Sequence, residues 1–247
     1  MTFAREELLA AALARLIREV PTRHVAVGAA SPIPAAAVWL AKIGHDPGLR
    51  LSLLHRPRGN PFTEGTRELF DLTGQGRVEL FFLGGGEIDG RANLNLIGTG
   101  DWPGGAVRFP GSFGSAFMYM MAGRTILFRE EHSPRVLVEH VAHISAPGVS
   151  AAGVFRRGHA QALVTGRCVF RFHPERARFS LLSVHPGESV ETIRAATGFA
   201  FDAADEVPQT PPPTEAELAL LRGPVADEMR DTYPEFCARV WAGARAA

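Results

Sequence analysis

Helical segments alternate with short apolar runs along the first third of the chain, and this alternation restricts the fold more than any other feature. The spacing of apolar residues predicts helices over 8–20, 35–43 and 63–72. Short β-rich runs predict strands over 24–28, 49–54 and 78–83. Such alternation is typical of parallel sheets. We therefore expect an α/β fold with an open, mostly parallel sheet covered by helices on both faces.

The rest of the chain indicates a smaller strand-rich part and a C-terminal arm. Further strands are predicted over 124–129, 139–144, 160–165, 168–172 and 179–184, with a turn at Gly166-Arg167. A short helix over 189–197 follows, and four prolines between Val207 and Pro213 predict a stiff linker. A capping box at 214–217 begins the last helical region. We therefore expect an α/β domain over 1–205 and a linker with a peripheral helical arm over 206–247.

The charge balance argues against nucleic acids and membranes as partners. The chain has 26 acidic and 26 basic residues without a basic stripe, and Lys42 is its one lysine. No apolar run approaches the roughly 20 residues that a membrane helix needs. Charged residues interrupt the N-terminal apolar run, which excludes an ordinary signal peptide. Cys168 and Cys237 lack metal-ligand spacing and are compatible with a reducing compartment. We expect a cytoplasmic protein.

A glycine-rich stretch over 81–114 holds ten of the 26 glycines and is the main candidate for a site. Gly84, Gly85 and Gly86 directly follow a predicted buried strand. Glycines at such a place let backbone N–H groups approach an oxyanion or a phosphate. Ligands also gather at the carboxyl ends of parallel strands, where the loops at 55–60 and 84–95 belong. Tight turning is the alternative role of these glycines. Neither nucleotide-binding glycine motif is present.

Polar residues and a second glycine cluster extend this candidate site. Asn93 and Asn95 share one face if their segment is extended. Glu87 and Asp89 are either a carboxylate pair that takes part in catalysis or groups that orient the loop. The cluster Gly111-Ser112-Phe113-Gly114 precedes an apolar segment over 116–122, which predicts a turn into a helix whose N-terminal amides face an anion.

Three other patterns are weaker indications of chemistry. Ser112 does not lie in a G-x-S-x-G motif, and the sequence places no histidine and acid to activate it. His140 and His143 are expected on opposite faces of a strand, and His132 does not complete a set of metal ligands with them. We therefore expect no metal. The methionines over 118–121 indicate core packing.

The motifs of this stretch resemble those of the β subunit of family I CoA-transferases, of the glutaconate CoA-transferase type. The resemblance begins with 76–89, Ala92-Asn93-Leu94-Asn95 and 109–114. It continues in register through 126–128, Glu131-His132, 145–148, 163–165, 169–172, 183–187 and 197–202. It implies an open α/β fold and an α subunit of similar architecture in an α2β2 assembly. It also implies an active site at the α–β junction for acyl-CoA thioesters, with coenzyme A as part of the substrate and no permanently bound cofactor.

The sequence departs from this family at the residue that carries its chemistry. Family transferases use a β-subunit glutamate, in a motif similar to L-x-L-L-Y-E-S-G, as the nucleophile that receives the acyl group. The matching segment here is 51–58, and Arg56 stands at the position of the glutamate. A guanidinium stays protonated and forms no acyl anhydride. Glu64 restores the motif only if the loop is rebuilt. Arg56 itself is either a surface cation or a clamp for a carboxylate or a CoA phosphate.

Relatives in this family that also lack the β glutamate are the steroid-ring-opening CoA hydrolases, in which an acid of the α subunit is thought to activate water. The resemblance therefore predicts hydrolytic or ring-opening chemistry. The alternatives are CoA transfer with a displaced nucleophile and a non-catalytic subunit that binds its partner. The predicted catalytic residues are Asn93, Gly85 and Gly114. The predicted substrate- and CoA-binding residues are Gly84, Gly86, Glu87, Asn95, Gly111, Ser112, Phe113 and Arg56. Phe113 replaces a glycine often found there, which narrows the loop.

Overall fold

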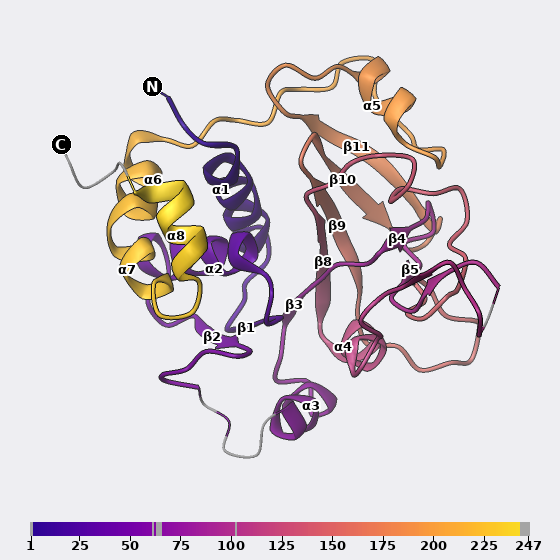
Figure 1. Ribbon diagram of the computed structural model, residues 1–247, viewed down its shortest axis with the longest axis horizontal. Coiled ribbons are helices and arrows are strands. Elements are labelled where there is room, and N and C mark those ends of the chain that lie inside the picture. Colours follow the sequence, from indigo (N-terminus) through magenta and orange to yellow (C-terminus); the bar gives the residue numbers. More distant parts are fainter. Residues whose placement is uncertain (1, 61, 63–65, 102, 243–247) are drawn as a thin grey trace. The chain divides into compact units, whose positions relative to one another are not determined.

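The computed structural model describes the chain apart from residues 1, 61, 63–65, 102 and 243–247 (Figure 1). The chain divides into two compact units. We call residues 1–82 with 211–247 the N-terminal unit and residues 83–210 the central unit. This division differs from the predicted boundary at 205, because the C-terminal helices bury apolar side chains within the same unit as the first helices.

Three parallel strands form the sheet of the N-terminal unit. The middle strand β1 (His24–Val27) pairs with β2 (Arg50–Leu53) on one side and with β3 (Leu80–Leu83) on the other. All four residues of β1 are buried, because each strand face meets other apolar groups. The helices α1 (Arg5–Arg18), α2 (Pro32–Gly44) and α3 (Thr66–Gly74) confirm the predicted alternation. The first residues of the third predicted helix, 63–65, lie outside the described residues.

The C-terminal helices are part of this unit rather than a peripheral arm. They are α6 (Glu215–Leu220), a π-helical turn η1 (Leu221–Val225), α7 (Ala226–Met229) and α8 (Pro234–Trp241). The predicted capping box is confirmed, since Thr214 Oγ1 accepts from Glu217 N and Glu217 Oε2 accepts from Thr214 N. Arg222 donates to both carboxylate oxygens of the buried Glu7 on α1. A charged pair of this kind ties the arm to the start of the chain.

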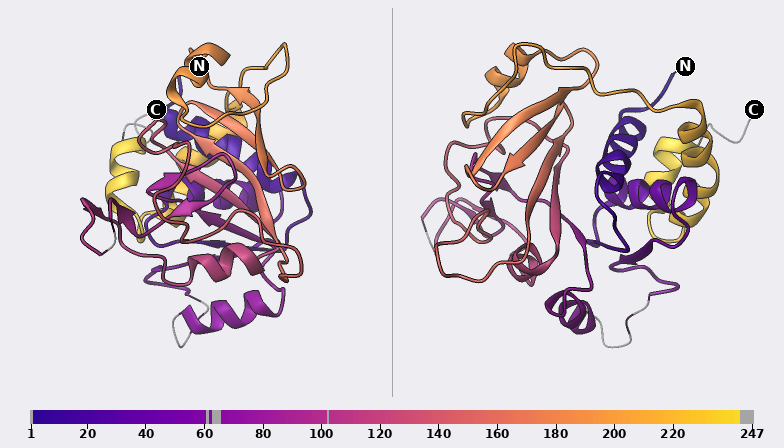
Figure 2. Two further views of the ribbon diagram at one scale, coloured as in Figure 1. Left: turned by 90° about the vertical axis from the view of Figure 1, so that its right-hand side faces the viewer. Right: turned by 180° about the vertical axis from the view of Figure 1, so that it is seen from behind.

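The central unit is built on four strands in the order β8 (Arg124–Arg129), β9 (His159–Thr165), β10 (Cys168–His173) and β11 (Arg178–Val184). β8 and β9 are parallel, whereas β9, β10 and β11 are antiparallel. Figure 2 shows these strands from two further sides. The predicted turn at Gly166-Arg167 joins β9 to β10. Phe170, Phe179 and Phe199 form an aromatic core at this end of the unit. The α/β class with a smaller strand-rich part is confirmed.

Short elements carry the glycine-rich stretch. β4 (Glu87–Ile88) pairs with β5 (Leu94–Asn95), and β6 (Gly98–Thr99) pairs with β7 (Val107–Arg108). Two short helices follow in this unit, α4 (Ser115–Met121) and α5 (Val190–Ala196). The predicted strand over 139–144 is wrong, because this segment forms bends around a hydrogen bond from Ala142 N to Glu87 Oε2. No helix among the described residues combines the length and the apolar character that crossing a bilayer requires.

Candidate functional site

The triple glycine at the end of β3 is required by close packing. A Cβ atom on Gly84 would lie 2.8 Å from Phe128 O, and one on Gly85 would lie 2.9 Å from Glu87 O. A Cβ atom on Gly86 would overlap the ring of Phe109. The φ angles of these glycines lie outside the left-handed region, so conformational freedom is not the reason for them. The bend therefore brings the backbone closer to its neighbours than any other residue type allows.

The three amides of this bend are not equivalent. Gly86 N donates a hydrogen bond of 2.9 Å to Asn95 O, so its amide already serves the fold. Gly84 is exposed whereas Gly85 is buried. Within the bend, Gly84 is therefore the exposed residue, and the amide of Gly86 is committed to the fold.

Asn95 and Glu87 form a buried polar pair that supports the bend. Asn95 is fully buried and donates to Glu87 Oε2 and Gly98 O, both at 2.7 Å. Its Oδ1 accepts from Ile97 N and Gly98 N at 3.0 and 3.2 Å. All four hydrogen-bonding positions of the amide are therefore occupied. In the structure the side chain of Asn95 therefore holds the loop, whereas the sequence predicts that it contacts a ligand.

Asp89 and Asn93 form a second buried pair. Asp89 Oδ1 accepts from Arg91 N and Asn93 N, and its Oδ2 accepts from Asn93 Nδ2 at 3.0 Å. Asn93 Oδ1 accepts from Gly148 N at 3.0 Å, which ties the loop to a distant segment. Both side chains are buried. Two roles are predicted for Glu87 and Asp89, catalysis and orientation of the loop. These contacts agree with orientation of the loop.

The second glycine cluster turns into α4 as the sequence predicts. Gly111 has a φ of +101° and donates to Leu96 O, while Ser115 N donates to Ser112 O at 2.7 Å. Gly114 caps α4, and its carbonyl accepts from Met118 N. Phe113 has a left-handed φ of +43° and an exposed fraction of 83%. A φ of this sign is unfavourable for a bulky residue.

Phe109 brings the two glycine clusters together, and sequence reasoning missed it. Its ring lies against Gly86, and Phe109 N donates to Ile97 O at 2.9 Å. The triple glycine and the loop over 109–114 are therefore neighbours within the central unit. An aromatic residue before Pro110 inside a glycine-rich stretch was the available signal.

Arg56 lies in the N-terminal unit, just beyond the carboxyl end of β2. The turn before it includes His55 with a φ of +69°. Nη2 of Arg56 donates to Glu228 Oε2 at 2.9 Å, and the guanidinium of Arg56 lies 5.1 Å from the centre of the Trp39 ring. The side chain of Arg56 is 25% exposed and that of Glu228 is 41% exposed. Glu228 comes from α7, and no sequence motif signals it. Glu64 lies outside the described residues.

His132 belongs to a buried cluster of hydrogen-bonded side chains. Its Nδ1 lies 2.8 Å from Thr165 Oγ1 and its Nε2 lies 2.9 Å from Thr197 Oγ1. Burial, together with the charge of Arg167, lowers its pKa from 6.5 to about 4. Burial raises the pKa of the neighbouring Cys168 thiol. Among the residues that the structure describes, no group of three or more histidine, cysteine, aspartate or glutamate side chains is arranged to hold a metal.

Comparison with known proteins shows the family of this chain. The family model described as Coenzyme A transferase matches residues 55–196, which is more than half of the chain. A 3-oxoadipate CoA-transferase subunit of Pseudomonas knackmussii is 28% identical over 89% of this chain and 92% of its own length. The cholesterol ring-cleaving hydrolase IpdB subunit of Rhodococcus jostii is 25% identical over 63% of this chain and 62% of its own length.

Solved structures show the same fold. The IpdAB structure of Rhodococcus jostii RHA1 has a TM-score of 0.78 at 23% identity, over 90% of this chain and 94% of that chain. Glutaconate coenzyme A-transferase from Acidaminococcus fermentans has a TM-score of 0.77 at 20% identity, over the same shares of the two chains. The expected likeness to β-type chains is confirmed by the two relatives named above. The chain belongs to the coenzyme A transferase family.

Proposed function

We propose that this chain is the β subunit of a heteromeric enzyme that acts on acyl-CoA thioesters by hydrolytic or ring-opening chemistry. One observation carries the proposal: the motif resemblance aligns Arg56 with the glutamate that is acylated in the family transferases. The ion pair with Glu228 and the stacking on Trp39 support a fixed position for the guanidinium of Arg56. A fixed cation binds an anion but accepts no acyl group. The similarity to a ring-cleaving hydrolase subunit supports the same chemistry.

In this proposal the catalytic acid or base comes from an α-type partner. Water adds to the carbonyl carbon, the bond to the leaving sulfur or carbon breaks, and the leaving atom takes up a proton. The part of this chain is to form the substrate wall and stabilise the oxyanion, with the amides of Gly84 and Gly114 as donors and the buried Gly85 shaping the bend between them and the strand. Gly111, Ser112 and Phe113 form the wall. Coenzyme A enters as part of the substrate, and the enzyme needs no permanent cofactor. A cytoplasmic location stays a prediction.

The contacts of Asn93 change the role that we propose for it. Because Asp89 and Gly148 occupy its amide, it acts by positioning the loop that follows the glycine bend. Glu87 and Asn95 support the same loop from within. These residues therefore act through the backbone that they hold.

A second candidate function is CoA transfer with a displaced nucleophile, and Glu228 is the observation that favours it. Its carboxylate lies 2.9 Å from the guanidinium of Arg56, which the motif resemblance aligns with the family's glutamate. A carboxylate there can attack a thioester carbonyl, release the CoA thiolate and form a mixed anhydride. The ion pair with Arg56 makes this carboxylate a weaker nucleophile than an unpaired one, so we rank this candidate second.

The experiment incubates the purified α–β pair with acyl-CoA, with an acceptor acid and with hydroxylamine. Hydrolysis predicts free or ring-opened acid, no labelled enzyme, and little loss of turnover in Glu228→Gln. Transfer predicts a hydroxylamine-sensitive enzyme adduct that Glu228→Gln abolishes. Arg56→Gln is expected to raise KM, and Arg58→Gln is the matched control because Arg58 is 86% exposed in the same loop. Tight association without turnover of any acyl-CoA would refute both and indicate a non-catalytic subunit.

A further inference from the structure

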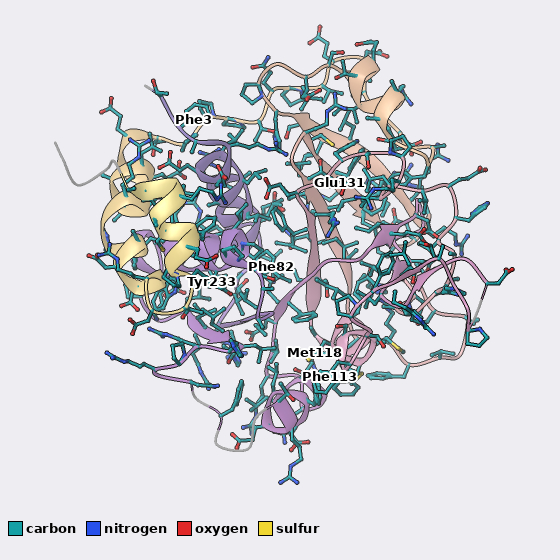
Figure 3. All side chains as sticks on the ribbon, viewed as in Figure 1. Phe3, Phe82, Phe113, Met118, Glu131 and Tyr233 are labelled. Carbon is teal, nitrogen blue, oxygen red and sulfur yellow. The ribbon has the colours of Figure 1, made fainter. Side chains whose placement is uncertain are left out.

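The C-terminal helices reach the loops that follow β1 and β2 in the N-terminal unit. Tyr233, which Figure 3 labels, is the N-cap residue of α8, and its hydroxyl donates to Ala29 O at 2.8 Å. Glu228 of α7 accepts from Arg56 at 2.9 Å. Ala29 lies in the loop between β1 and α2, and Arg56 lies in the loop after β2. The C-terminal helices therefore hold both loops at the carboxyl ends of these strands, where parallel sheets bind their ligands.

Two contacts from different helices hold the guanidinium of Arg56. The guanidinium lies over the Trp39 ring of α2, and its Nη2 donates to Glu228 Oε2 of α7. Stacking on a ring fixes the plane of a guanidinium, and a hydrogen bond to one edge fixes its rotation within that plane. The nearby ion pair of Arg58 and Asp231 adds little, because these side chains are 86% and 55% exposed. Arg56 is therefore the cation of this loop whose direction is fixed.

The indole of Trp39 contributes through its ring face. Trp39 is 6% exposed, and its Nε1 is buried without a hydrogen-bond partner among the residues that the structure describes. A buried indole N–H without a partner is unfavourable, and leucine or phenylalanine would avoid that cost. Tryptophan is also the side chain that attracts a cation most strongly over its ring. The unpartnered N–H thus points to the ring face as the reason for tryptophan at this position.

The guanidinium of Arg56 keeps N–H groups for a ligand. Among the described residues, Glu228 is the one side chain to which Arg56 donates, and a guanidinium carries several further N–H groups. The side chain of Arg56 is partly exposed. Glu228 is 41% exposed, so water screens its charge, and its main effect on Arg56 is on direction. A guanidinium held in this way binds an oxyanion with little further loss of side-chain entropy.

We infer that Trp39 and Glu228 are positioning residues, which preorganise Arg56 to bind an anionic group of the substrate. The inference rests on the proposed function for the contact between Arg56 and an acyl-CoA. The group that binds is an oxyanion, either a carboxylate of the acyl part or a phosphate of coenzyme A. Loss of either positioning contact lets the guanidinium take other directions, so binding weakens although Arg56 itself is intact.

The experiment measures the Kd of the purified α–β pair for coenzyme A and for succinyl-CoA by calorimetry. Trp39→Leu and Glu228→Ala are each expected to raise the Kd about three- to tenfold, which is the effect of releasing one immobilised side chain. Both probes weaken if Arg56 binds a phosphate, whereas only succinyl-CoA weakens if Arg56 binds a carboxylate. Glu235→Ala is the matched control, because Glu235 is exposed on the neighbouring helix α8.

Conservative variants and a double-mutant cycle separate positioning from folding. Trp39→Phe keeps a ring face and Glu228→Gln keeps a hydrogen-bond acceptor, so both should retain most of the affinity. In an Arg56→Gln background, Trp39→Leu and Glu228→Ala should not change the Kd further, because no guanidinium is left to position. An effect on the Kd that persists in this background would overturn the inference.

Other outcomes also decide the matter. Wild-type Kd values for both Trp39→Leu and Glu228→Ala would overturn the inference. Equally tighter binding by Glu228→Ala and Glu228→Gln would overturn it for Glu228, since that residue would then only neutralise the cation. Weaker binding by the variants, together with a hydroxylamine-sensitive enzyme adduct, would leave the positioning roles standing and reject hydrolytic chemistry. Absence of any binding of either probe to the wild-type pair would overturn both proposals.

Discussion

Acidification should destabilise the central unit through His132. Thr197 Oγ1 donates its own proton to Ile193 O, so it accepts from Nε2–H of His132. Nδ1 then carries the lone pair and faces Thr165 Oγ1. That hydroxyl oxygen already accepts from Arg167 N and Cys168 N. A proton on Nδ1 would therefore point at an oxygen whose acceptor capacity is taken. The fold favours the neutral imidazole.

The magnitude follows from the difference between folded and unfolded pKa. The pKa is 6.5 for an ordinary histidine and about 4 for His132 in the fold. Between these values the unfolded chain binds a proton that the folded chain does not, so stability is full above about pH 6.5 and falls as the pH drops. The total loss by about pH 4 is about 3 kcal/mol, and the loss at about pH 5 is about 2 kcal/mol.

Hydrogen exchange of amides in β9 and β10, measured at each pH, reports the opening free energy of this unit. We compare wild type with His132→Gln, which lacks the titrating group, so that contributions of other residues cancel in the difference. His140→Gln is the matched control, because the side chain of His140 is 84% exposed. The wild type should lose about 2 kcal/mol more than His132→Gln between about pH 7 and pH 5. Parallel losses in the two proteins would refute this account of His132.

Three further predictions concern the candidate site. Asn93→Ala leaves Asp89 Oδ2 and Gly148 N without their partner, so urea unfolding should show a loss of about 3 kcal/mol. Turnover should fall while the heteromer still assembles, and unchanged turnover would remove Asn93 from the site. Gly86→Ala pushes the Phe109 ring away and should lower kcat/KM roughly tenfold or more. Adding Phe109→Leu to Gly86→Ala should restore part of the lost kcat/KM. Absence of any recovery would contradict the proposed contact between residue 86 and the Phe109 ring. Tyr119→Phe loses the hydrogen bond to Ala92 O, which should lower the free energy of unfolding by about 1 kcal/mol in thermal unfolding. An unchanged Tm would count against a contribution of this hydrogen bond to stability.

The sequence by itself determined the fold class and the location of the main loops. Helical and strand periodicities are local properties of the chain, so the parallel β1–β3 group and the β9–β10 turn followed from them. Glycine clusters marked the bend and the turn into α4, and motif order indicated the family before any comparison. The one strand that failed, over 139–144, is held in bends by a contact with Glu87, which lies far away in sequence.

Only the tertiary structure decided which neighbours the polar side chains of the candidate site contact. Asn93 and Asn95 were predicted to face a ligand. In the structure their side-chain amides form hydrogen bonds with Asp89, Gly148 and Glu87. Glu228 reaches Arg56 across 172 positions of sequence, and Phe109 meets Gly86 across a loop. The C-terminal helices also join the first helices in one unit. Such pairings depend on which distant surfaces bury each other, and no local pattern of residue types encodes that.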